Sequence, residues 1–197
     1  MYLLRLDIEH FGSPNWNPFS SFIRPGDYVL IKPNLVTDDA DITCTVTHAS
    51  IIRVLIDYVW IALKGKGKIV VGDAPQENAD FNRIIRVTGL RALQKYYKSK
   101  GIGIELADLR SFVSDRKFVW RKKRDLPCRI IDLGERSYLN DLSKDSNRFY
   151  GAYWNRREVR IYHSPGKHRY MVPQSVLDAD VIIMVPKMKT HKKQESH

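Results

Sequence analysis

The amino-acid sequence predicts an α/β fold with a mostly parallel sheet, flanking helices and a β-rich insertion in the second half. First, the segments YVLI (28–31), KIVV (68–71) and VIIMV (181–185) are continuously apolar, which is typical of parallel strands covered on both faces. Second, helical periodicity separates the first two segments. Third, short strand-like pieces alternate with polar turns between residues 110 and 170. We therefore expect one α/β domain, residues 1–197, that contains this insertion.

The other elements follow from local patterns. Thr47 is the expected N-cap of a helix over residues 48–63, because its hydroxyl can accept a hydrogen bond from the first turn. The inward face of this helix is expected to hold Ile51, Ile52, Leu55, Tyr58, Val59 and Ala62. We further expect a strand over 1–8, a polar loop over 38–48, helices over 81–87 and 90–100, a strand over 102–109, and strand-like pieces KFVW (117–120), CRIIDL (128–133) and EVRIYH (158–163).

The chain carries a net charge of +11, which favours anionic partners such as phosphates, carboxylates and nucleic acid. The basic run RKKR (121–124) beside Trp120 suits nucleic acid, but such a run is more often a solvated face, so we expect weak binding at most. The two cysteines, Cys44 and Cys128, share no motif, which indicates a reducing compartment. We find no signal peptide and no membrane span, and we expect a cytoplasmic protein.

Polar and charged residues follow the apolar strands directly. Lys32 and Asn34 follow the first strand, and Asp73 ends the second. Ligands of open parallel sheets bind outside the carboxyl ends of the strands, and the helix that begins near His48 adds its positive end there. The sequence therefore predicts an anion site with titratable groups at this edge, and the last strand contributes Lys187, Lys189, Thr190 and His191.

Metal and nucleotide sites have weaker support. Asp38, Asp39 and Asp41 are most simply a solvated loop, because hard cations need more oxygen ligands than this loop supplies. His163 and His168 flank a turn and are a weak candidate for a metal pair. The sequence contains no phosphate-binding loop, dinucleotide fingerprint, nucleophile elbow or zinc spacing, so any metal or cofactor stays unknown.

Four blocks in this order carry a family resemblance: GDYVLIKPNLV, VTHASIIRVLIDYV, KIVVGDAP and DADVIIMVPKMKTH. Together they resemble the family known as domain of unknown function 362. Members of that family continue past the Lys-Thr-His motif, whereas this sequence adds only KKQESH, so the resemblance implies a C-terminally incomplete domain. Some members carry an iron–sulfur module, but its cysteines are missing here, and that cofactor is not carried over.

We expect a protein that binds a small anionic metabolite, and catalysis at the same edge stays an open alternative. Lys32, Lys187 and Lys189 would bind the anion, and Asn34, Thr47 and Thr190 would orient it. His48, Asp73 and His191 would transfer protons or bind a metal. The alternatives are a polyanion or nucleic-acid binding protein and an inert truncated remnant. The apolar last strand also predicts an exposed sheet edge through which the chain self-associates.

Overall fold

The computed structural model describes residues 11–14, 16–38, 42–114, 120–122, 126–144 and 156–188. The chain divides into two compact units. Unit 1 comprises Met1–Lys123 and Asp178–His197, and unit 2 comprises Arg124–Leu177. The predicted strand over 1–8 lies outside the described residues.

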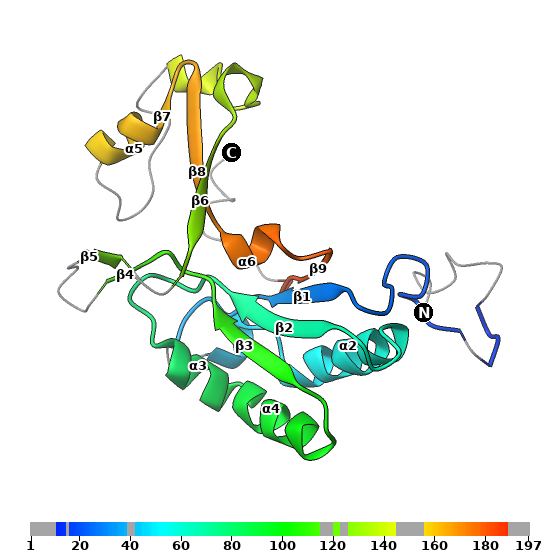
Figure 1. Ribbon diagram of the computed structural model, residues 1–197. Helices are drawn as coiled ribbons and strands as arrows, with labels where there is room; N and C mark the ends of the chain where they lie inside the picture. The colour runs from blue at the N-terminus through cyan, green and yellow to red at the C-terminus, as the bar shows by residue number, and fades with distance from the viewer. Residues whose placement is uncertain are drawn as a thin grey trace. The chain divides into compact units, whose positions relative to one another are not determined.

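Unit 1 contains a four-stranded sheet in the order β3-β2-β1-β9 (Figure 1). Its strands are β1 (Tyr28–Pro33), β2 (Lys68–Asp73), β3 (Ile104–Asp108) and β9 (Val181–Val185). All three pairings are parallel, and Leu30 in the middle of β1 lies opposite Val70 and Ile182. The predicted parallel sheet is confirmed.

Three helices cover one face of this sheet: α2 (Ala49–Ala62), α3 (Phe81–Val87) and α4 (Leu90–Ser99) (Figure 1). Alternate strand residues, such as Val29, Ile31, Ile69 and Val71, point into the core that these helices enclose. Such alternation places the intervening residues of each strand on the other face of the sheet. A short helix, α1 (Ile42–Thr45), lies where the sequence predicted only a loop.

Two expectations about α2 were wrong. Its N-cap is His48 rather than Thr47. Its buried side chains are Ile52, Ile56, Val59 and Ala62, whereas Ile51 is 51% exposed. Because α2 is apolar around most of its circumference, periodicity alone does not define the buried face, and packing on the sheet decides it.

The second half of the chain is rich in antiparallel pairs. In unit 1, β4 (Phe112–Ser114) pairs with β5 (Trp120–Lys122). In unit 2, β6 (Cys128–Asp132), β7 (His163–Ser164) and β8 (Lys167–Pro173) form a sheet in the order β6-β8-β7. The remaining elements are the 3-10 helices η2 (Gly134–Arg136) and η3 (Leu142–Lys144) and the helices α5 (Arg156–Tyr162) and α6 (Gln174–Leu177).

The predicted strand-like piece EVRIYH is helical over most of its length, because α5 extends to Tyr162 and β7 begins only at His163. The alternating Val159 and Ile161 suggested a strand, but the arginine and glutamate residues around them are good helix formers. With this correction, the mixed α/β fold with a β-rich second half is confirmed. Within the described residues, no helix is long and apolar enough to span a membrane.

Candidate functional site

The carboxyl ends of β1, β2 and β9 meet at one edge of the unit 1 sheet, because the three strands run parallel. Lys32 lies opposite Met184, and Pro33 lies opposite Val185. Asp73 ends β2, and Lys187 follows β9 by two residues. Lys32, Asp73 and Lys187 therefore share this edge, as their positions in the sequence suggested. Lys189, Thr190 and His191 lie outside the described residues.

Asp73 is a buried connector at this edge, with only 5% of the residue exposed. Its Oδ1 forms an ion pair with Lys32 Nζ at 2.7 Å, and its Oδ2 accepts a hydrogen bond from the Leu35 amide at 2.7 Å. Its backbone oxygen accepts from the Leu109 amide at 2.9 Å. Asp73 thus joins the loops that follow β1 and β3, and both of its carboxylate oxygens are engaged.

Thr47 connects β1, β9 and the start of α2. Its hydroxyl oxygen accepts a hydrogen bond from the Asn34 amide at 3.0 Å and donates one to the Val185 carbonyl at 2.8 Å. Its own amide donates to the Asn34 carbonyl at 2.9 Å. Since Thr47 is also buried, these bonds fix the strand ends relative to the helix. The side-chain amide of Asn34 forms no hydrogen bond within the described part of the chain.

His48 is exposed at the positive end of α2. Its Nδ1 accepts a hydrogen bond from the Ser50 amide at 3.2 Å and lies 2.8 Å from Ser50 Oγ. Because Nδ1 is the acceptor, the proton of the neutral ring is on Nε2, which is then a donor.

The two lysines differ: Lys32 is paired with Asp73, whereas Lys187 forms no ion pair with any residue that the structure describes.

Sequence reasoning missed Arg110, which is 7% exposed. Its Nε and Nη2 donate to the two carboxylate oxygens of Asp108 at 2.9 and 2.8 Å. Its Nη1 donates to the carbonyls of Gln76, Glu77 and Ala79 at 2.7, 3.2 and 2.8 Å. Arg110 therefore fixes the loop that follows Asp73. In the sequence, only Asp108 and Arg110 at the end of a predicted strand indicated this arrangement, and such a pair is usually an exposed ion pair on the surface.

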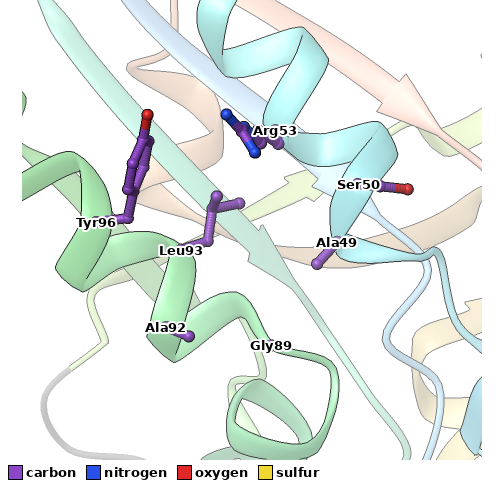
Figure 2. A pocket seen from close by; sticks show the side chains of 7 residues that line it. All are labelled: Ala49, Ser50, Arg53, Gly89, Ala92, Leu93 and Tyr96. Atoms are coloured by element: carbon purple, nitrogen blue, oxygen red, sulfur yellow. The ribbon is translucent and has the colours of Figure 1, made fainter.

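A separate groove of about 350 Å³ lies between the start of α2 and helix α4 (Figure 2). Ala49 and Ser50 of α2 line one side, directly after His48. Figure 2 shows the Arg53 guanidinium facing the Tyr96 ring across the groove, 5.2 Å from its centroid. The groove is mainly apolar, and Arg53, its charged residue, already contacts the Tyr96 ring.

Unit 2 contains the two histidines of the predicted turn. His163 and His168 lie opposite each other across the β7–β8 hairpin, with ring centroids 5.7 Å apart. Burial, together with the neighbouring His168, lowers the pKa of His163. Among the described residues, no three histidine, cysteine, aspartate or glutamate side chains gather as a metal site would require.

Comparison with known proteins gives one family match. No curated protein and no solved structure matches the chain. The family model described as "Domain of unknown function (DUF362)" matches residues 29–123. The match includes Lys32, Asn34, Thr47, His48 and Asp73 but not Lys187. The resemblance inferred from the sequence blocks is thus confirmed over β1 to β5, and in this region the chain matches domain of unknown function 362.

Proposed function

We propose that the protein binds a small anionic metabolite, a carboxylate or a phosphate, at the carboxyl edge of its parallel sheet. The observation that supports this most directly is Lys187, a half-buried cation beside the ends of β1 and β9 without an ion pair among the described residues. A charged ammonium in such a position is well placed to bind an anion. The match to a family of unknown function does not restrict the ligand further.

Three groups around Lys187 would complete the proposed site. The side-chain amide of Asn34 and the Nε2–H of His48 are donors at the same edge, and the first turn of α2 adds its positive end. Lys32 contributes less positive potential, since Asp73 neutralises it. Lys189, Thr190 and His191 follow Lys187 in the sequence and remain part of the proposal.

The hydrogen bonds favour different roles for the remaining residues. Asp73 and Thr47 would hold the loops in position, because their side-chain oxygens are engaged within the fold. His48 is the better candidate for proton transfer, since it is exposed and its Nε2 takes no part in capping α2. If the protein is an enzyme, we expect His48 rather than Asp73 to exchange a proton with the ligand.

Titration with inorganic phosphate and with acetate, at constant ionic strength, tests the proposal. We expect either anion to raise the melting temperature of the wild-type chain, because a ligand stabilises the state that binds it. Lys187→Gln should weaken binding about tenfold or more, since a hydrogen bond to a charged group contributes about 1.5–3 kcal/mol.

Lys95→Gln is the matched control, because Lys95 is an exposed lysine on α4, away from the strand ends. This variant should bind as the wild type does. Equal loss in both variants would indicate general attraction by the net charge, and unchanged binding in Lys187→Gln would refute the proposed site.

A further inference from the structure

The two edges of the unit 1 sheet differ in chemistry. At one edge, β3 carries Glu105, whose side chain is 56% exposed, and an exposed charge of this kind discourages pairing with another strand. At the other edge, β9 has the sequence VIIMV, without a charge, proline or glycine. No segment among the described residues pairs with the outer side of β9. This edge therefore lacks the usual protection against strand pairing.

The side chains of β9 alternate between two environments. Val181, Ile183 and Val185 pack partly against the core on the helix side. Ile182 and Met184 point to the other face and are 42% and 60% exposed. The alternation of half-buried and exposed residues is symmetric about Ile183, and so is the apolar character of the sequence.

We propose that the outer edge of β9 binds the same edge of a second copy of this chain, in antiparallel orientation. A closed two-fold interface requires this orientation, because each copy must present the same surface to the other. With the axis at Ile183, Val181 lies opposite the second copy's Val185, and Ile182 lies opposite the second copy's Met184. Apolar residues face apolar residues at every position, and the two sheets join into one.

The charges beside the strand match the same arrangement. Continuing the antiparallel register brings Lys187 close to Asp178 and Asp180 of the second copy, and the symmetry repeats this contact. Asp178 and Asp180 are exposed, and Asp180 Oδ2 also accepts a hydrogen bond from the Tyr28 amide at 2.8 Å. Lys187 forms no ion pair within the described part of its own chain, so a bound anion and the second copy would compete for it. A parallel arrangement of the two strands would place lysine near lysine. Charge complementarity therefore selects the antiparallel pairing.

The net charge of +11 on each copy opposes the association. Salt screens this repulsion over a Debye length of roughly 8 Å at physiological ionic strength, whereas hydrogen bonds between strands act at contact. The dimer should therefore form more completely as the salt concentration rises. Association driven mainly by ion pairs would weaken instead.

Sedimentation equilibrium of the full chain tests the proposal, at several protein and salt concentrations and in buffer without phosphate or carboxylate. We expect the mass to approach that of two chains as the protein concentration rises. Met184→Lys should abolish this increase, because the two introduced lysines would lie diagonally across the two-fold axis on the same face of the joined sheet and repel each other. Ile61→Lys is the matched control: Ile61 is 61% exposed on α2 and Met184 is 60% exposed, so both variants lose a similar apolar surface and gain one charge.

Ile182→Lys and a charge exchange provide independent measurements that do not depend on the folding of Met184→Lys. Asp178→Lys should weaken the dimer, and adding Lys187→Asp should restore it, since the exchanged charges attract again. A wild-type chain that stays monomeric at every concentration would overturn the proposal. So would dimers of Met184→Lys and Ile182→Lys as stable as the wild type, or equal loss of the dimer in Ile61→Lys.

Discussion

Each compact unit contains an aspartate–arginine pair of the same length but in a different environment. In unit 1, Arg110 Nη2 lies 2.8 Å from Asp108, and the side chains are only 7% and 13% exposed. In unit 2, Arg169 Nε lies 2.8 Å from Asp132, and the side chains are 44% and 35% exposed. Both pairs join a guanidinium to a carboxylate. They differ in burial and in the number of hydrogen bonds, because Arg110 donates two to Asp108 and three to backbone carbonyls, whereas Arg169 donates one to Asp132.

Burial determines how much each pair contributes to stability. Water solvates the groups of an exposed pair when the pair breaks, so such a pair contributes little. A buried pair is different, because the group that remains after one partner is removed cannot recover its hydrogen bonds from water. The pair Lys32–Asp73 is intermediate, with side chains 32% and 7% exposed. The three pairs thus predict a graded series of effects.

Arg110→Met should have the largest effect. The substitution removes the guanidinium donors from the buried carboxylate of Asp108 and from the carbonyls of Gln76 and Ala79. The Asp108 carboxylate keeps the Arg110 backbone amide, and the Gln76 carbonyl keeps the Ala79 amide. We expect the free energy of unfolding to fall by about 3–5 kcal/mol, measured by urea denaturation. Hydrogen exchange should also increase in the loop after Asp73, which Arg110 fixes.

Arg169→Met is the matched control in unit 2, because it removes an arginine at the same distance from an aspartate but in an exposed position. This variant should change the stability of unit 1 little. If unit 1 unfolds at the same urea concentration in both variants, the buried pair contributes no more to the stability of unit 1 than the exposed pair does.

The strands that position the candidate site were predictable from the sequence. β1, β2 and β9 contain continuous apolar runs, and Lys32, Asp73 and Lys187 come within two residues of the ends of these runs. Parallel pairing follows from the helices between strands, so the approach of Lys32 to Asp73 could be anticipated. These features depend on local pattern and on topology, which a single sequence contains.

The network around the site was not predictable in the same way. Thr47 and His48 are both reasonable caps, and the choice depends on the carbonyl of Val185, which is distant in the sequence and accepts the Thr47 hydroxyl. Arg110 binds carbonyls of a loop about thirty residues earlier. A single sequence does not show which backbone carbonyl will lie near a given side chain, because that depends on tertiary packing.

Lys32→Met should have an intermediate effect. It removes the cation from Asp73, whose carboxylate is nearly buried and keeps the Leu35 amide as a donor. We expect a loss of about 1–2 kcal/mol in urea denaturation, since the site of Lys32 itself is partly open to solvent. Lys68→Met is the control. Its pair with Glu105, 2.9 Å long, is 53% and 56% exposed, so the loss should stay below about 1 kcal/mol. A larger loss in Lys68→Met would break the series.

Asp132 should have the smallest effect at neutral pH, and its contribution should appear as a pH dependence. The hydrogen bond from Arg169 is the main reason that the pKa of Asp132 falls from 3.8 to about 2, and the amides of His168 and Gly134 lower it further. Because the folded pKa is the lower one, the ionised carboxylate stabilises unit 2 above the unfolded pKa of about 3.8. This stabilisation is lost as the pH falls through about 2.

An NMR titration of the Asp132 carboxyl carbon measures this pKa directly, and it should titrate near 2. Arg169→Met should raise the pKa of Asp132 toward 3.8, because the hydrogen bond from Arg169 is the main reason that the pKa is low. The amides of His168 and Gly134 remain, so the pKa should stay below 3.8. Asp132→Asn should be less stable than the wild type at pH 5, and the difference should shrink as the pH falls toward 2. A normal pKa in the wild type would mean that Arg169 and Asp132 do not hold their contact in solution. The exposed pair would then contribute nothing to stability, and the contrast with the buried pair of unit 1 would be larger than we propose.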